Sequence, residues 1–303
     1  MTNSNLHQNI PRGMLLMVLA VFSFACMDTA IKWLAEYYSS YQVSFFRGAF
    51  SLPFILVWFA SKGDWRDLKT NQLTWHLIRG VMSVLFIVGV VVGLRELPIA
   101  SAYAIFFSAP LLIALLSVIF LNETVGIRRW SAIFVGLIGV LIALNPTSVN
   151  FLSYGALACI GGVVGYSFVV IIIKKLSATE SSFSMVIYFL LLLTVGCGLL
   201  ALLDWRDVDW QHAPIFFILG LSGALGQYLI TEAFKLAPVS LIAPLDYTGL
   251  VWAALFGYLL WSEIPTLAIW LGSTIIIGSG LYLMHRESIV KKSEPAVDPI
   301  NEH

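Results

Sequence analysis

The chain has 303 residues, of which 59% are hydrophobic and only 11% are charged. Soluble domains carry roughly 25% charged residues, so this composition argues against an ordinary soluble protein and favours a membrane protein. The formal net charge is zero and the sequence has no basic block, so we expect no nucleic-acid partner.

A helix that crosses a bilayer needs about 20 apolar residues. The sequence predicts an all-α membrane protein whose ten transmembrane helices lie at residues 13–35, 42–61, 75–95, 99–121, 129–146, 153–173, 183–203, 213–235, 240–261 and 267–285. Residues 1–12 are expected to form a cytoplasmic segment, and residues 286–303 a disordered cytoplasmic tail. The first helix is too long for a signal peptide and contains Asp28 and Lys32, so we expect it to remain in the protein.

The charges of the loops orient these helices. If the N-terminus is cytoplasmic, most loop lysines and arginines lie inside, and only Lys32, Arg95 and Arg206 lie outside. The positive-inside rule therefore predicts that both termini are cytoplasmic. The very short loops are typical of a multi-pass protein of the bacterial inner membrane.

The two halves of the chain resemble each other. Equivalent residues include, at an offset of 140, Pro98 and Pro238, Glu123 and Glu263, and Trp130 and Trp270, and, at an offset of 142, Gly13 and Gly155, and Lys32 and Lys174. We interpret this series as an internal duplication. Each copy holds five helices, an odd number, so the second copy starts on the opposite side and the repeats are inverted. Inverted repeats recur among secondary transporters, whose substrate site lies at the repeat interface.

Short motifs point to a family. Pro98 and Pro238 each stand near a helix start in L-x-P-[IV]-[AS] or A-P-V-S, and F-F-R-G (Phe45–Gly48), S-A-P (Ser108–Pro110) and L-N-E-T (Leu121–Thr124) occur in order. Together with the five-plus-five duplication they resemble the drug/metabolite transporter superfamily, EamA type, over about residues 13–285. The resemblance implies two EamA-like repeats, 13–146 and 153–285, around a central cavity walled in part by the third, fourth, eighth and ninth helices. Such families include exporters of amino acids and importers of riboflavin or S-adenosylmethionine.

Charged residues inside helices are costly in lipid and normally face a cavity or each other. At about 1.5 Å per residue, Asp28 lies roughly 10 Å and Arg47 about 8 Å from the outer ends of their helices. An ion pair between them is therefore feasible, either at a substrate site or as a purely structural link. Lys32 competes for Asp28 one turn away, or extends outward.

A second set of charges lies near the cytoplasmic side. Arg79, Glu232 and Asp246 each fall roughly 6–9 Å from an inner helix end. They are candidates for an inner gate, a substrate contact or a proton carrier, although Glu232 is equally well explained as a solvated residue. Asp246 is the strongest candidate, because Pro244 two residues earlier lacks an amide and loosens the local backbone.

Aromatic and polar residues complete the candidate binding or gating set: Tyr103, Phe106, Phe107, Ser108, Gln227, Tyr228, Tyr247 and Trp252. Aromatic faces would stack a flat or amphipathic ligand, and packing against lipid or other helices explains any one of them equally well. Glu123 and Glu263 recur at helix C-termini, which favours a structural role in capping the following loop. Cys26, Cys159 and Cys197 lie in apolar segments and the histidines are scattered, so we expect no metal and no cofactor.

These features predict a secondary transporter, not driven by ATP, that moves a small organic metabolite (an amino acid, vitamin or nucleoside-like compound) by alternating access. The alternative is an intramembrane enzyme acting on a lipid or small molecule, but the sequence lacks H-E-x-x-H, G-x-S-x-G and Walker-type motifs. The expected partners are the substrate, the lipid bilayer and a coupling proton. The sequence leaves a monomer and a homodimer equally open.

Overall fold

The computed structural model describes residues 9–62, 68–97, 105–144, 153–262 and 266–293. Over these ranges the chain is helical and contains no strand. The elements are α1 (Ile10–Leu34), α2 (Ser40–Lys62), α3 (Leu73–Glu96), α5 (Ala109–Leu121), α6 (Ile127–Leu144), α7 (Tyr154–Leu176), α8 (Ser182–Ala201), η2 (Trp210–His212), α9 (Ala213–Leu236), α10 (Val239–Ile242), η3 (Ala243–Tyr247), α11 (Thr248–Trp261) and α12 (Leu267–Ser293).

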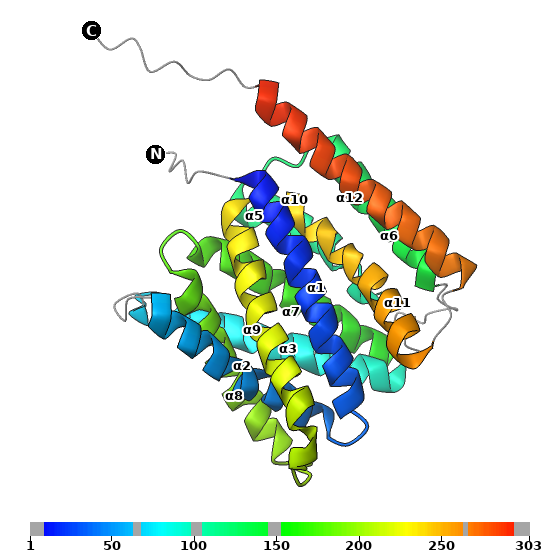
Figure 1. Ribbon diagram of the computed structural model, residues 1–303. Helices are drawn as coiled ribbons and strands as arrows, with labels where there is room; N and C mark the ends of the chain where they lie inside the picture. The colour runs from blue at the N-terminus through cyan, green and yellow to red at the C-terminus, as the bar shows by residue number, and fades with distance from the viewer. Residues whose placement is uncertain (1–8, 63–67, 98–104, 145–152, 263–265, 294–303) are drawn as a thin grey trace.

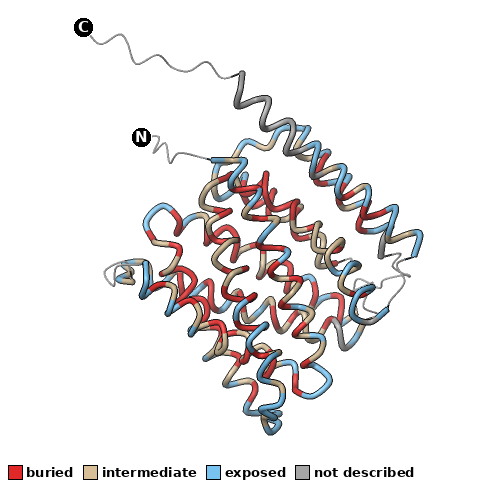
Figure 2. The backbone as a smooth tube through the Cα atoms, viewed as in Figure 1, coloured by how far each residue is buried: buried red, intermediate tan, exposed pale blue. Residues whose placement is uncertain are grey.

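The prediction of an all-α membrane protein is confirmed. Seven described segments are long and apolar enough to cross a bilayer, and shorter apolar helices cover Ala109–Leu121 and Leu267–Ser279. Large apolar side chains such as Leu15, Phe134 and Leu259 are exposed. Figure 2 shows these exposed stretches on the outer faces of the bundle and the buried residues between the helices. Lipid tails are the natural contact for such outer faces.

Helices from the two halves of the sequence pack against each other in pairs. The first helix, α1, lies along α9, and α7 lies along α3. Two further pairs are α2 with α8 and α6 with α12, the latter at one edge of the bundle (Figure 1). In each pair, one helix comes from the first half of the chain and one from the second half.

In two of these pairs, equivalent glycines lie directly against the partner segment. A Cβ added to Gly13 in α1 would lie 2.9 Å from Cβ of Ala237, just after α9. A Cβ added to Gly155 in α7 would lie 3.0 Å from Cγ of Leu97, just after α3. Because Gly13 and Gly155 are equivalent at offset 142, and Leu97 and Ala237 at offset 140, the halves touch each other through the same contact with their roles exchanged.

The helix predicted at residues 240–261 is interrupted. It begins as α10, continues as the 3-10 segment η3 and only then becomes α11. Pro244 stands in the first turn of η3, where its missing amide removes a backbone hydrogen bond. The break therefore places Asp246 in irregular backbone between two helical pieces.

The start of α10 is held by Glu123. The Glu123 carboxylate accepts hydrogen bonds from the backbone N–H groups of Val239 (2.8 Å) and Ser240 (3.0 Å) and from the Ser240 hydroxyl (2.7 Å). The prediction that Glu123 caps the loop following its own helix is therefore wrong. Its negative charge instead satisfies the free amides at a helix N-terminus in the other half of the chain.

The preceding helix end is held by a cation. Lys174, in the last turn of α7, donates to the carbonyl oxygens of Phe234 (2.8 Å), Lys235 (3.4 Å) and Ala237 (2.9 Å). These carbonyls belong to the C-terminal end of α9, where a positive charge is favourable. Lys174 and Glu123 thus fix the turn between α9 and α10 from both sides.

Equivalent residues end two equivalent helices. Asn122 and Ser262 cap α5 and α11 in the left-handed backbone conformation, with φ of 54° and 55°, and their numbers again differ by 140.

The last helix, α12, continues to Ser293. The disordered tail predicted from residue 286 therefore starts too early, and residues 294–303 lie outside the described residues.

Candidate functional site

Tyr166 and Asp246 meet inside the bundle. The Tyr166 hydroxyl, on α7, donates a hydrogen bond of 2.8 Å to Oδ2 of Asp246 in η3. Asp246 is half-buried and next to Pro244, where the broken helix brings its carboxylate toward α7. A carboxylate at this depth needs such a donor, because an unpaired charge away from water is costly.

Aromatic rings lie beside this pair. The Phe86 ring of α3 is 5.2 Å from the Tyr166 ring and 6.3 Å from the Phe106 ring, the latter edge-on. Gly162 of α7 has no side chain to block Phe106, since a Cβ there would lie 3.2 Å from the ring. The result is an aromatic wall formed by α3, α7 and the residues just before α5.

Arg47, on α2, lies beside Phe24 of α1. Its guanidinium is 5.7 Å from the centre of the Phe24 ring on α1, and it interacts electrostatically with Asp28 and, less strongly, with Cys197 and Tyr166. Within the described ranges neither a hydrogen bond nor a salt bridge occupies this guanidinium. Its donors therefore remain available to an anionic group of a ligand.

Asp28 lies one helical turn after Phe24. The residue is exposed to solvent, and its carboxylate interacts electrostatically with Arg47. We define the central site as Phe24, Asp28, Arg47, Phe86, Phe106, Tyr166 and Asp246.

The predicted ion pair between Asp28 and Arg47 is only partly reproduced. The two residues interact across the site, but the described structure contains no salt bridge between them. The two opposite charges therefore interact without a direct salt bridge.

The predicted inner set of charges is not brought together. Arg79 is buried between α3 and α8, where it donates to the Met185 carbonyl (2.9 Å) and its guanidinium lies 4.9 Å from the Phe189 ring. Glu232 accepts a hydrogen bond from the Ser182 hydroxyl. Both residues hold the first turns of α8, whereas Asp246 faces Tyr166.

The predicted aromatic set is divided as well. Phe107 lies 6.2 Å from Tyr247, which packs against Gly136 of α6. Trp252 makes an edge contact of 5.0 Å with Phe22. Phe107 and Tyr247 belong to an apolar cluster with Val140, Leu250 and Ile276, and Trp252 packs against α1. Among the predicted aromatic residues that the structure describes, Phe106 is therefore the one placed at the central site. Tyr103 lies outside the described residues.

The remaining candidates have local partners. Tyr228 packs against Trp58 (4.6 Å) and Phe183 (4.9 Å). Gln227 is buried in α9, and the Ser108 hydroxyl donates to the Ile105 carbonyl (2.6 Å). Packing thus explains Tyr228, and helix geometry explains Ser108.

Sequence reasoning missed Phe24, Phe86 and Tyr166. The internal repeat contained a signal for two of them. Phe24 and Tyr166 occupy equivalent positions at an offset of 142, and Phe106 and Asp246 occupy equivalent positions at an offset of 140. The hydrogen bond between Tyr166 and Asp246 thus corresponds, in the other half, to two phenylalanines.

A polar cluster, also missed, lies at the start of α8. Glu180 accepts hydrogen bonds from Thr70 (2.6 Å) and Ser184 (3.2 Å), and one of its oxygens is 3.9 Å from Nε2 of the buried His76. Tyr188 donates to the Leu68 carbonyl (3.2 Å). These contacts hold the start of α8 to α3 and to the segment that precedes α3.

The start of α2 is held in a similar way. A hydrogen bond of 2.8 Å joins the Tyr38 hydroxyl and Nδ1 of His212. The Gln42 side chain both donates to the Arg206 carbonyl (2.6 Å) and accepts from the Arg206 amide (3.0 Å). Tyr38 and Glu180 differ by 142 in number, so equivalent helix starts are tied down in both halves.

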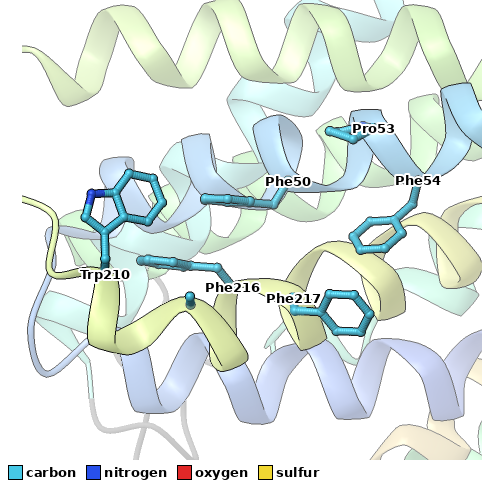
Figure 3. Close-up of a pocket in the computed structure, with 7 residues that line it drawn as sticks. Phe50, Pro53, Phe54, Trp210, Phe216 and Phe217 are labelled. Atoms are coloured by element: carbon cyan, nitrogen blue, oxygen red, sulfur yellow. The ribbon is translucent and has the colours of Figure 1, made fainter.

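Figure 3 shows a separate pocket of about 280 Å³ between α2 and the start of α9. Its lining residues are Phe50, Pro53, Phe54, Trp210, Ala213, Phe216 and Phe217. The rings of Phe50 and Phe216, two of these residues, stack 4.8 Å apart. The lining is apolar and uncharged, so it lacks the groups that would orient a polar metabolite.

Similarities to known proteins agree with this arrangement. The EamA-like transporter family model matches residues 11–145 and 153–285. The chain is 31% identical to a riboflavin transporter of Vibrio cholerae (93% of this chain, 95% of that protein) and 31% identical to an S-adenosylmethionine uptake transporter of Rickettsia bellii (89% and 92%). It is 28% identical to the pseudopaline exporter CntI of Pseudomonas aeruginosa (88% and 93%).

A crystal structure shares the fold, with a TM-score of 0.80 and 16% identity over 93% of this chain and 99% of the other. At that identity the likeness concerns architecture alone. The two matched stretches of the family model cover most of the sequence, and relatives that match nearly the whole chain are named transporters of small molecules. The chain therefore belongs to the EamA-like transporter family and is a secondary transporter of small metabolites.

Proposed function

We propose that this protein carries its substrate through the central site by alternating access. The observation that carries the proposal is the proximity of polar and charged groups from both halves: Arg47 and Asp28 come from the first half, and Tyr166 and Asp246 from the second. A site built by both halves changes its access when the halves rock against each other.

We further propose that the chain crosses the membrane ten times, as two inverted repeats at residues 13–146 and 153–285. The pairing of α1 with α9 and of α3 with α7 supports this, as does the exchanged contact of Gly13 and Gly155. So do the left-handed caps at Asn122 and Ser262.

For orientation, we propose that both termini face the cytoplasm of a bacterial cell and that the protein resides in the inner membrane. In Figure 1 the helix α1 begins at the end of the bundle where α12 ends, which supports a common side for the termini. The excess of lysine and arginine in the loops assigned to the inside supports the cytoplasm as that side.

The substrate class follows from the relatives and the site together. Relatives are named for riboflavin, S-adenosylmethionine and pseudopaline, and the central site offers aromatic faces beside charges. We propose a polar metabolite of comparable size, such as an amino acid, vitamin or nucleoside-like compound. Asp28 and Asp246 are the candidate carriers of a coupling proton.

Reconstitution tests the transport proposal. Purified protein in liposomes should accelerate uptake or exchange of labelled metabolites relative to empty liposomes. Chemical turnover of a substrate without translocation would support the enzyme alternative instead. The mass of the purified protein in a lipid nanodisc would separate monomer from homodimer.

Cysteine labelling tests the topology. Single cysteines placed at residue 12 and at residue 290, in a variant without the native Cys26, Cys159 and Cys197, should both resist an impermeant reagent in intact cells. Labelling of only one of them would contradict an even number of spans.

A further inference from the structure

The apolar pocket between α2 and α9 lies on the side of these helices that meets the bilayer. Four of its lining residues are exposed, and these are Pro53, Trp210, Ala213 and Phe217. Beyond the pocket, the same two helices expose further apolar side chains, among them Leu56, Val57, Ile218 and Leu221. Both helices belong to segments that are long and apolar enough to cross a membrane. The pocket is therefore a hollow in a surface that contacts lipid tails.

Tight contacts between α2 and α9 bound the pocket toward the interior of the protein. Phe216 is only 1% exposed, and its ring stacks on Phe50. The rings of Phe54 and Phe217 make an edge contact of 5.2 Å (Figure 3). Next to them, a Cβ added to Gly220 would lie 2.9 Å from the Phe54 ring and would clash with the Phe50 carbonyl. The pocket shares no lining residue with the central site, so a ligand reaches it from the bilayer.

The size and chemistry of the pocket suit a hydrocarbon chain. Its volume of about 280 Å³ lies just below the roughly 300–1,000 Å³ of pockets that enclose drug-sized ligands. Its side chains offer one polar atom, the indole nitrogen of Trp210. Apolar hollows exclude water, whereas methylene groups gain more carbon–carbon contacts in a concave aromatic lining than on an open helix face. An acyl chain of a neighbouring lipid is therefore the group that fills the pocket.

The loop between α8 and α9, which leads into the pocket at Trp210, carries an excess of negative charge. Trp205 and Trp210 are exposed, and tryptophans in such positions mark the interface between membrane and water. The charged residues of the loop are all exposed and comprise three carboxylates and one guanidinium: Asp204, Asp207, Asp209 and Arg206. This excess attracts the ammonium group of a lipid headgroup and repels a headgroup with a net negative charge.

We propose that this pocket binds one acyl chain of a phospholipid whose headgroup carries a primary ammonium group, such as phosphatidylethanolamine. The lipid lies in the leaflet on the side of the loop between α8 and α9, with its ammonium group beside the aspartates of that loop. Since α2 belongs to the first half of the sequence and α9 to the second, the acyl chain packs against both halves at their junction. This lipid site is separate from the route of the substrate and goes beyond the proposed function.

Photochemical labelling tests the site on the full-length protein in phosphatidylcholine nanodiscs. The probe is phosphatidylethanolamine with a diazirine in the middle of one acyl chain, and labelled residues are located by mass spectrometry. Phe217 of the pocket and Phe134 of α6 are similarly exposed, at 56% and 51%. Phe217 should be labelled about fivefold more strongly than Phe134, because the pocket adds carbon–carbon contacts to the chain.

The headgroup is tested with phosphatidylglycerol that carries the same labelled chain. It should label Phe217 about two- to fivefold less than phosphatidylethanolamine does, which is the range expected for exposed ion pairs. The double variant Asp204→Asn with Asp207→Asn should remove this difference and leave the labelling of Phe217 by phosphatidylethanolamine above that of Phe134.

Filling the pocket tests the position of the chain. Ala213→Trp should lower the labelling of Phe217 to the level of Phe134, and the smaller Ala213→Leu should lower it in part, which serves if Ala213→Trp does not fold. Ala60→Trp is the matched control, because Ala60 is an exposed alanine toward the other end of α2. This control should be labelled like the parent protein.

Equal labelling of Phe217 and Phe134 in the parent protein would overturn the proposal, as would unchanged labelling in both Ala213 variants. Equal labelling of Phe217 by the two headgroups would overturn the choice of an ammonium lipid. A second copy of the chain is the competing occupant. The variant Phe217→Cys, made without the native Cys26, Cys159 and Cys197, should stay monomeric under oxidation, and a disulfide-linked dimer would show that protein rather than lipid covers the pocket.

Discussion

The hydroxyl of Tyr166 donates to the carboxylate of Asp246 at a distance of 2.8 Å, while the residues at the equivalent positions of the first half are Phe24 and Phe106. The same two positions therefore carry a polar contact in one half and an apolar pair in the other. The scaffold itself therefore accepts both an apolar and a polar version of this contact.

Asp246→Asn is expected to abolish or uncouple transport while the protein still inserts and folds. The amide keeps the size of the side chain and can still accept a hydrogen bond from Tyr166, but it cannot hold a charge or a proton. Flux in liposomes and the elution profile of the purified variant measure the two properties. Near-normal flux would remove Asp246 from the site.

Tyr166→Phe is expected to lower flux by about tenfold to a hundredfold, because a hydrogen bond to a charged group contributes about 1.5–3 kcal/mol. Tyr258→Phe is the matched control, since Tyr258 lies exposed on α11. Equal flux in the two variants would mean that the Tyr166 hydroxyl does not support Asp246 during transport.

The charge exchange Asp28→Arg with Arg47→Asp tests the electrostatic link across the central site. Each single change places two like charges in the same space and should lower thermal stability. The double variant should recover part of that loss, because unlike charges again face each other. Strictly additive losses would show that the two residues do not interact.

Glu123→Ala is expected to cost about 1–2 kcal/mol of stability, a typical loss for a helix N-terminal cap. The variant leaves the amides of Val239 and Ser240 without their acceptor. Glu123→Gln should recover part of the loss, because an amide oxygen still accepts. Thermal unfolding in detergent measures the effect, with Glu36→Ala as the exposed control; equal melting temperatures for the two alanine variants would contradict the cap.

Gly89→Ala should destabilise the contact of α3 with α7. A Cβ at this position would lie 2.5 Å from the Ala158 carbonyl oxygen and 2.7 Å from Cα of Gly162, so the helices must move apart at a cost of about 1–3 kcal/mol. Gly278→Ala is the control, because a Cβ there meets no atom within 4 Å. A neutral Gly89→Ala would show that the helices separate without loss.

The fold could be predicted largely from hydrophobic segments and from the repeat. Long apolar runs define spans because the bilayer sets their length, and Pro244 marked the region where the helix breaks. The repeat offset also contained the exchanged contacts of Gly13 and Gly155, although a sequence offset alone does not say which helices touch.

The site was predicted less completely, for a physical reason. Asp246 and Arg47 were recognisable because a charge in an apolar helix is costly wherever it lies. Tyr166 and Phe86 were not recognisable, because an aromatic residue in a membrane helix can equally well face lipid, pack against another helix or contact a ligand. Their role depends on how α7 crosses η3 and α3, a geometry that no local pattern contains. Arg79 illustrates the converse, since this charged residue lies away from the central site, where its Nη1 donates to the Met185 carbonyl.

The packing of α1 along α9 has a consequence for synthesis. The first helix leaves the ribosome and enters the bilayer long before its main partner has been translated. Until then Asp28 must be shielded by an insertion factor, by headgroups or by the helices translated between α1 and α9 in temporary positions. Assembly of this protein therefore finishes only near the end of translation, and a truncated chain that stops before α9 is a natural target for membrane quality-control proteases.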